Sequence, residues 1–141
     1  MNLVLYNLII SSVLTAVILI TQIINYPLFK YVQNDFSTFH QNYVKRIGFI
    51  VAPIMVLELI IVSIMLVQDF DNNLIKFSAV LVFIIWISTF FMQVPIHNEL
   101  SLNKKKNLHL LIYSNWVRVI CWMLKLIISI MIFNIQITGL N

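Results

Sequence analysis

The chain has 141 residues, of which 61% are hydrophobic and 10% charged, and its mean hydropathy is +0.96. This composition excludes an ordinary soluble domain, because too few polar residues remain to cover a globule in water, whereas lipid can cover apolar surface. The net charge of +4 does not indicate a nucleic-acid partner, because three bases form the run 104–106 and others flank apolar stretches. We therefore predict one membrane domain over residues 1–141, with the lipid bilayer as its first partner.

Four stretches with few or no charges are each long enough to cross the roughly 30 Å hydrocarbon layer as a helix. They cover residues 3–29, 47–67, 77–96 and 110–137. The first is predicted to be a retained span, because no base precedes it and it is too long for a signal peptide. The expected fold is an all-α integral membrane four-helix bundle.

Charge in the connecting segments predicts the orientation. Lys30, Lys45, Arg46 and the lysine run lie in the first and third loops, whereas Asp69 and Asp71 lie in the second. The positive-inside rule then predicts a multi-pass protein of the cell (inner) membrane with both termini outside.

The first loop is not uniformly polar. Phe36, Phe39, His40 and Tyr43 recur at helical spacing between polar residues. This pattern predicts a short interfacial amphipathic helix in the first cytoplasmic loop.

The first and third spans share a weakly repeated sequence pattern near their inner ends, called the sequence echo below. Gln22 is followed by Pro27, and Gln93 is followed by Pro95. Two interpretations stay open: a duplicated helical hairpin, or the chance similarity of isoleucine-rich hairpins.

Polar residues in three spans recur every three, four or seven positions, which places each set on one helix face. Because a polar stripe facing lipid is unfavourable, the three faces are expected to point at one another. The sets are Ser11, Thr15, Gln22 and Asn25; Trp86, Thr89, Gln93 and His97; and Asn115, Arg118, Trp122 and Lys125.

Glu58 is the acid of the second span. At about 1.5 Å per residue, it lies about 16 Å from the inner end of its span, between Arg118 at about 12 Å and Lys125 at about 22 Å. A charge in the bilayer centre costs at least about 2.5–3.5 kcal/mol, so pairing is expected, and we predict a Glu58–Arg118 salt bridge. That pair would either form a functional site or only lock two helices together. Lys125 would join the site, balance the charge by pairing with Glu58 in place of Arg118, or snorkel to the outer face.

His40, His97 and His109 are all predicted at the inner face. Ligation of a haem or metal by His40 and His97 is an alternative to a role as polar anchors, and no cofactor is identified. The single cysteine, Cys121, is expected to be a small apolar-facing residue.

Two short segments carry a family resemblance. Residues 94–100 (VPIHNEL) followed by 115–118 (NWVR) resemble the signature of the anthrone-oxygenase-like family of small four-helix membrane proteins, with Pro95, Leu100, Asn115 and Arg118 matching. His97 replaces an asparagine of the family pattern, and Trp116 stands two residues before Arg118 rather than four. The resemblance implies oxygen-dependent conversion of anthrones to quinones. It implies that Arg118 and Asn115 would stabilise a phenolate or enolate, that Glu58 or His97 would take a proton, and that Trp86 and Trp122 would flank the ring.

The sequence thus predicts a polar intramembrane site for a small lipophilic molecule, in an oxygenase- or oxidoreductase-like enzyme acting on an aromatic or quinone-like substrate. The alternatives are a non-catalytic subunit of a membrane complex and a small oligomeric transporter, and a homo-oligomer is an option for either. The candidate catalytic residues are Glu58, His97 and Arg118. The candidate substrate-binding residues are Gln22, Trp86, Gln93, Asn115 and Trp122.

Overall fold

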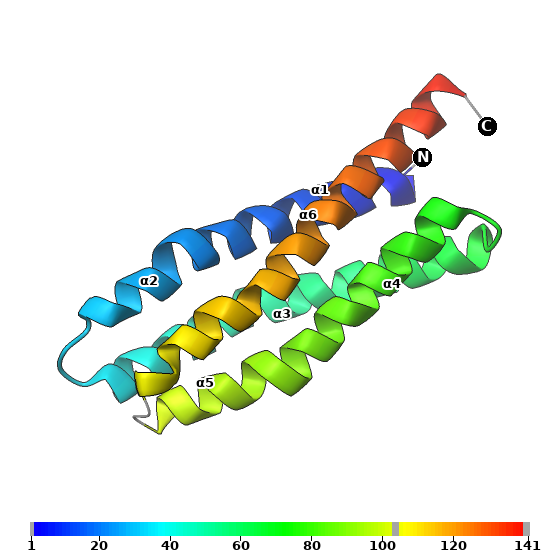
Figure 1. Cartoon of the computed structure of the whole chain (residues 1–141). Coiled ribbons are helices and arrows are strands. Elements are labelled where there is room, and N and C mark those ends of the chain that lie inside the picture. The colour runs from blue at the N-terminus through cyan, green and yellow to red at the C-terminus, as the bar shows by residue number, and fades with distance from the viewer. Residues whose placement is uncertain (1, 103–104, 140–141) are drawn as a thin grey trace.

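The computed structural model describes residues 2–102 and 105–139, and every regular element in these ranges is a helix. Four helical rods, Asn2–Tyr31, Phe36–Gln68, Asn73–Ser101 and Lys105–Thr138, are long and apolar enough to cross a membrane. They run up and down in turn, so the two ends of the chain lie at the same end of the bundle (Figure 1). The predicted all-α, multi-pass four-helix architecture is confirmed.

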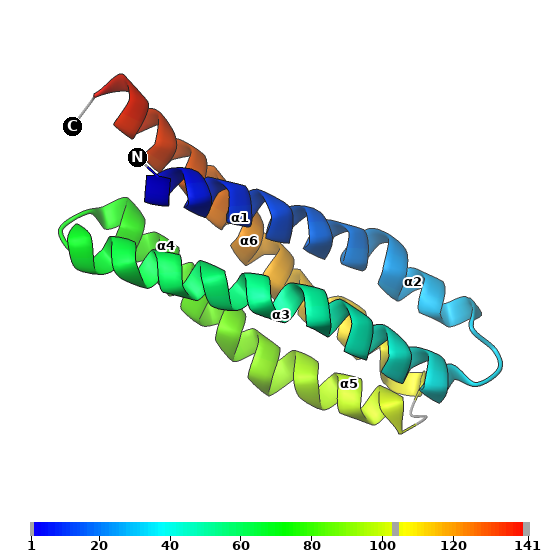
Figure 2. The same ribbon diagram turned by 180° about the vertical axis from the view of Figure 1, so that it is seen from behind.

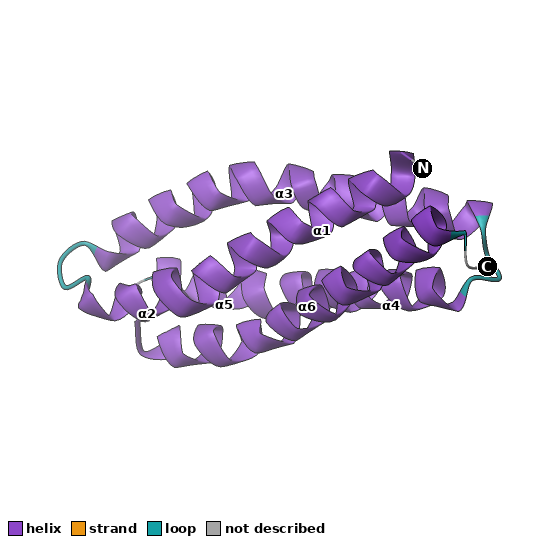
Figure 3. Cartoon of the chain, turned by 90° about the horizontal axis from the view of Figure 1, so that it is seen from above, coloured by secondary structure: helices purple, strands orange, loops and turns teal. Residues whose placement is uncertain are grey.

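The rods form a bundle with four corners. Helices α1 (Asn2–Ile20) and α4 (Asn73–Ser88) each pack against both α3 (Phe36–Gln68) and α6 (Leu108–Thr138). Consequently α3 and α6 occupy opposite corners and run in the same direction, as Figures 2 and 3 show from behind and from above. Contacts between α3 and α6 must therefore cross the bundle interior.

The ends of the bundle differ in charge. One end, called the basic end below, carries the connections after Tyr31 and Ser101 together with Lys30, Lys105 and Lys106. The other end, called the terminal end, carries both chain ends and the turn between α3 and α4. At that turn Asn72 caps α4, because its side chain accepts hydrogen bonds from the backbone N–H groups of Leu74 and Ile75.

Helix α3 differs from the prediction in one respect. Residues from Phe36 onward are helical as expected, but they continue without a break into the second span, so the structure has no separate interfacial helix. The 33 residues of α3 correspond to roughly 50 Å of helix, which exceeds the hydrocarbon layer. The reason is that Phe36 and His40 are buried inside the bundle, at 3% and 0% exposure, and do not lie on its surface.

Two π-helical segments interrupt the first and third rods. They are Thr21–Asn25, which leads into α2 (Tyr26–Leu28), and Thr89–Gln93, which leads into α5 (Val94–Ser101). Each begins six residues before a proline, Pro27 or Pro95. A proline cannot donate a backbone hydrogen bond, and its ring crowds the carbonyl four residues earlier, so a wider turn relieves the contact. The sequence echo therefore has a counterpart in the backbone, and both wide turns border the cavity described next.

Candidate functional site

Glu58 and Lys125 form an ion pair inside the bundle. Glu58 Oε1 lies 3.1 Å from Lys125 Nζ, and neither side chain is exposed. The prediction that Glu58 pairs with Arg118 is therefore wrong. The alternative that Lys125 snorkels to the outer face is wrong too, because its ammonium group points into the bundle.

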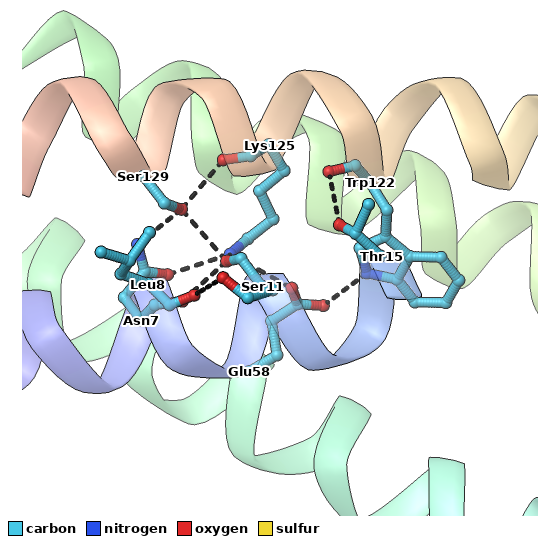
Figure 4. A network of polar contacts seen from close by, with 9 residues as sticks. Asn7, Leu8, Ser11, Thr15, Glu58, Trp122, Lys125 and Ser129 are labelled. Carbon is cyan, nitrogen blue, oxygen red and sulfur yellow. Dashed lines mark hydrogen bonds and ion pairs between the residues drawn. The ribbon is translucent and has the colours of Figure 1, made fainter. Parts of the chain in front are cut away.

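Four further side chains complete this cluster, and Figure 4 shows it from close by. Lys125 Nζ donates hydrogen bonds to Asn7 Oδ1 at 2.9 Å and Ser11 Oγ at 2.7 Å, while Trp122 Nε1 donates to Glu58 Oε2 at 3.1 Å. We call this set the Glu58–Lys125 network; its members are Asn7, Ser11, Glu58, Trp122, Lys125 and Ser129, with Ser129 accepting from Asn7 Nδ2 at 2.9 Å.

The network ties three helices together. Its side chains come from α1, α3 and α6, and its two charges have both a counter-charge and hydrogen bonds. A buried pair satisfied in this way does not need a ligand. Glu58 therefore fits the helix-locking interpretation better than a catalytic one.

Asn7 and Ser129 were missed as members of a buried cluster. Asn7 precedes Ser11 by four residues and Ser129 follows Lys125 by four, so both continue stripes that the sequence shows. The helical periodicity of the sequence therefore includes both residues, because the two polar stripes extend one turn further toward the terminal end than the predicted sets.

Arg118 has a different environment. The residue is 8% exposed, and within the described ranges no carboxylate lies at ion-pair distance from its guanidinium group. Its contact is with the Trp122 ring, whose centroid lies 5.1 Å from Arg118 Cζ. A buried charge without a counter-ion is rare and unfavourable, so this guanidinium group is a candidate for binding something that the chain itself does not provide.

Arg118 lines a cavity of about 440 Å³. The cavity lies between the first, second and third rods, and α6 contributes Arg118 and Trp122 to its lining. The lining residues are mostly apolar, and the polar or aromatic members are Thr21, Tyr26, Tyr43, Trp86, Thr89, Phe90, Gln93, His97, Arg118 and Trp122. We call it the Arg118 pocket.

Three buried polar atoms on the wall of the Arg118 pocket have no hydrogen-bond partner. They are Trp86 Nε1, Gln93 Oε1 and Arg118 Nε. Buried polar atoms are nearly always satisfied in folded proteins, so three such atoms in residues around one cavity show that hydrogen bonding among the described residues is incomplete there. They supply two donors and one acceptor.

Several of the residues that line the pocket are exposed apolar side chains. They are Ala52 and Val56 of α3 and Phe90 and Val94 of the third rod. They belong to helices that are long and apolar enough to cross a membrane, so exposed side chains there are suited to contact acyl chains. A larger hollow of about 770 Å³ lies at the terminal end, and none of its described lining residues is a base or a histidine.

A row of side chains leads from the pocket toward the basic end. Tyr26 Oη lies 3.2 Å from His97 Nε2, His97 Nδ1 lies 3.0 Å from His40 Nε2, and His40 Nδ1 lies 3.0 Å from Ser101 Oγ. Tyr26 and His97 line the pocket, whereas Ser101 is half-buried at the end of α5. We call this row the histidine chain.

The histidine geometry bears on the metal and haem alternative. The two facing imidazole nitrogens are hydrogen-bonded to each other, so they do not flank a gap wide enough for a haem plane. Within residues 2–102 and 105–139 no group of three or more histidine, cysteine, aspartate or glutamate side chains could hold a metal ion. His109 is exposed and lies away from the other two, against the Lys106 carbonyl oxygen.

The predicted site residues separate into three places. Trp86, Gln93, His97, Arg118 and Trp122 meet at the Arg118 pocket. Gln22 and Asn115 bind each other, with Asn115 Nδ2 donating to Gln22 Oε1 at 2.8 Å. Glu58 belongs to the network, and Trp122 joins network and pocket because its N–H contacts Glu58 while its ring lies against Arg118.

Tyr26 and Tyr43 line the pocket but were not expected there. Tyr26 follows Gln22 by four residues, which is the spacing of the polar stripe, and this was the available signal. Tyr43 accepts a hydrogen bond from Asn25 Nδ2 at 3.2 Å, so the last residue of the predicted stripe contacts a side chain that lines the pocket.

Comparison with known proteins found no family model, no curated protein and no solved structure that matches this chain.

Proposed function

We propose that the protein binds a lipophilic ring compound with a phenolic, enolic or quinone-like oxygen in the Arg118 pocket, and that Arg118 pairs with this oxygen. The observation that carries the proposal is the buried guanidinium group that has no counter-ion among the described residues and lines an apolar cavity. The cavity volume of about 440 Å³ falls in the range of roughly 300–1,000 Å³ that is typical of small-molecule sites.

The polar atoms of the pocket suit the anionic form of such a ligand. The positive charge of Arg118 favours an oxyanion in a water-poor site, and the free indole N–H of Trp86 is a second donor. Phenolate and enolate anions are the electron-rich forms that oxidants attack. An oxidoreductase- or oxygenase-like activity on an aromatic or quinone-like substrate is thus the proposed chemistry, in line with the resemblance carried by Pro95, Asn115 and Arg118.

The same proposal includes a location and an entry route. The protein lies in the cell (inner) membrane with both termini outside, because bases gather at one end of the bundle. The ligand enters from the lipid between Val56 and Phe90, where exposed apolar side chains line the pocket.

The alternatives explain less. A purely structural role suits the Glu58–Lys125 network but gives no reason for an unpaired Arg118. A transporter gated by a Glu58–Arg118 pair lacks that pair.

The test is binding of 1-naphthol, compared with 1-methoxynaphthalene, to protein purified in detergent. The two compounds have similar size, but only the naphthol can ionise. We expect tighter binding of naphthol and a red-shifted naphtholate absorption band. Arg118→Gln is expected to weaken naphthol binding by about 10- to 100-fold, the effect of one charge-assisted hydrogen bond of about 1.5–3 kcal/mol.

The matched control is Arg46→Gln, which removes an exposed base from α3. It is expected to bind naphthol like the wild type. Equal affinity of the wild type for both compounds, or equal naphthol affinity in the wild type and Arg118→Gln, would refute the proposal.

A further inference from the structure

The histidine chain connects the Arg118 pocket with the surface at the basic end. Its four side chains, Tyr26, His97, His40 and Ser101, come from three elements, α2, α5 and α3. Consecutive polar atoms lie 3.2, 3.0 and 3.0 Å apart, so each junction is within hydrogen-bond distance. The chain has no gap that a water molecule would have to fill.

Both histidines engage both of their ring nitrogens. A neutral imidazole has one N–H donor and one acceptor nitrogen, so two arrangements of the chain are consistent. In one, Tyr26 donates to His97, His97 to His40 and His40 to Ser101. In the other, every bond is reversed. Moving one proton along the histidine chain converts the first arrangement into the second, and no atom other than the transferred hydrogens has to change place.

The surroundings keep the chain dry in its middle. His40 is 0% exposed, and its ring stacks on Phe36 with centroids 5.7 Å apart, while the Phe29 ring meets it edge-on at 5.8 Å. The His40 and His97 rings are themselves stacked, with centroids 5.1 Å apart. Aromatic packing therefore holds the imidazoles in register and excludes competing water partners.

The outer end of the chain is accessible. Ser101 is half-buried, and the exposed Gln41 donates from Nε2 to the Ser101 carbonyl oxygen at 3.1 Å. Because Ser101 is only half-buried and is the last residue of α5, the inference takes water at the basic end as the group that exchanges protons with its hydroxyl. The residue at the inner end, Tyr26, lines the pocket together with Arg118.

From this arrangement we infer that the histidine chain carries a proton between the pocket and the water at the basic end. The inference rests on the proposed function, because it takes the ligand hydroxyl as the proton source. The ligand O–H bond breaks as Tyr26 accepts that proton and passes its own to His97 Nε2. His97 passes its Nδ1 proton to His40, and His40 passes its Nδ1 proton to Ser101 and water. The ligand is left as an oxyanion beside Arg118, and no electrons are transferred.

This path gives Tyr26, His97 and His40 roles that binding alone does not require. A ligand that ionises in an apolar pocket has to lose its proton to water, and lipid offers no route. The histidine chain supplies that route along the inside of the bundle. Tyr26 is the member that meets the ligand, and His40 acts through His97.

The experiment mixes purified protein rapidly with 1-naphthol in weakly buffered detergent solution. Naphtholate absorbance reports ionisation in the pocket, and a water-soluble pH indicator reports the released proton. In the wild type we expect both signals to rise together. In His40→Phe and Tyr26→Phe we expect both to slow by about 100-fold, the usual contribution of a positioned acid–base group. Equilibrium affinity should change less than about twofold in His40→Phe, because His40 does not line the pocket.

The matched controls are His109→Phe and Tyr113→Phe, whose side chains are exposed and are not members of the histidine chain. Both are expected to keep the wild-type rates. His40→Gln is a second variant in case His40→Phe does not fold. It keeps hydrogen-bonding groups but cannot exchange a proton in the same way, so it too is expected to be slow. Addition of imidazole to His40→Ala should restore part of the rate.

The outcomes separate the two proposals. If the wild type forms no naphtholate, the proposed function fails. If the wild type forms naphtholate but His40→Gln and Tyr26→Phe do so at the wild-type rate, only the proton path is overturned.

Discussion

Glu58 and Lys125 are paired across the diagonal of the bundle, from helices at opposite corners, at a distance of 3.1 Å. Because this contact crosses the interior, it fixes the separation of α3 and α6 and also the level at which they face each other. Arg118, seven residues before Lys125 on the same helix, has no such partner in the part of the chain that the structure describes. The two bases of α6 therefore have different roles: Lys125 stabilises the packing of the bundle, and Arg118 lines a cavity.

Breaking the ion pair from one side should destabilise the fold. Glu58→Gln and Lys125→Met are each expected to lower the free energy of unfolding by about 3–5 kcal/mol, because each leaves a buried charge without its counter-charge. The double variant Glu58→Gln/Lys125→Met should recover to within about 1 kcal/mol of the wild type, since no unpaired charge remains and Gln can still accept from Trp122. Unfolding of the purified protein by denaturing detergent measures this.

Asp71→Asn and Lys45→Met are the controls for these two changes, because both side chains are exposed. Neither should change stability by more than about 0.5 kcal/mol. A double variant less stable than both single variants would contradict the account of the network.

Filling the Arg118 pocket from α3 should block ligand entry without harming the fold. Gly48 lines the pocket, and a Cβ atom added there would meet nothing within 4 Å. Gly48→Ala should therefore stabilise α3 by up to about 1 kcal/mol and leave binding intact, whereas Gly48→Phe should lower naphthol affinity at least about tenfold.

Ile50→Phe places the same ring two residues further along α3, on a surface that is 55% exposed. It should not affect naphthol binding. If Gly48→Phe and Ile50→Phe bind naphthol equally well, the ligand does not occupy this cavity.

The hydrogen bond between Gln22 and Asn115 should couple the first and fourth rods measurably. A double-mutant cycle with Gln22→Leu and Asn115→Leu should give a coupling energy of about 0.6 kcal/mol and at most about 1.7 kcal/mol, as found for buried polar pairs between membrane helices. The same cycle on the exposed residues Ser12 and Asn134 should give none. Zero coupling at Gln22 and Asn115 would show that their contact does not contribute.

The proposed orientation can be tested with single cysteines in a Cys121→Ala background. Asn73→Cys lies at the terminal end and Asn34→Cys at the basic end, and both positions are exposed. A membrane-impermeant maleimide should label intact cells at position 73 only, because the positive-inside rule places the basic end, which includes position 34, in the cytoplasm. Lysed membranes should label at both positions. Labelling of intact cells at position 34 alone would reverse the orientation.

The sequence predicted the spans and their inward faces well, because both follow from composition and helical periodicity. Thr15, Gln22 and Lys125 are buried as their stripes require. Five of the eight candidate site residues meet at one cavity for the same reason. The helical periodicity of polar residues predicts which face of each helix points inward, and this prediction does not require the positions of the neighbouring helices.

Periodicity does not identify the partner of Glu58. That partner depends on how far along its helix each charged residue lies, and the sequence places the start of the second span at Ile47. Lys45 and Arg46 suggested that the span begins there, but they are exposed residues within a helix that starts at Phe36. His40 reaches Ser101, and Lys105 donates to the Val32 carbonyl oxygen, so the first turns of α3 lie level with the start of the fourth rod. Counted from there, Glu58 stands about 33 Å along its helix, level with Lys125 at about 30 Å and above Arg118 at about 20 Å.

The diagonal pair also sets a condition on biosynthesis. Membrane helices are made in sequence, and the second span leaves the ribosome long before the fourth. Until α6 arrives, Glu58 must either stay in a polar place or bear a cost of about 2.5–3.5 kcal/mol in lipid. The buried carboxylate of Glu58 therefore gains its counter-charge only when α6 inserts. We expect the first three rods to complete their packing at that step, which is the last one in the synthesis of the bundle.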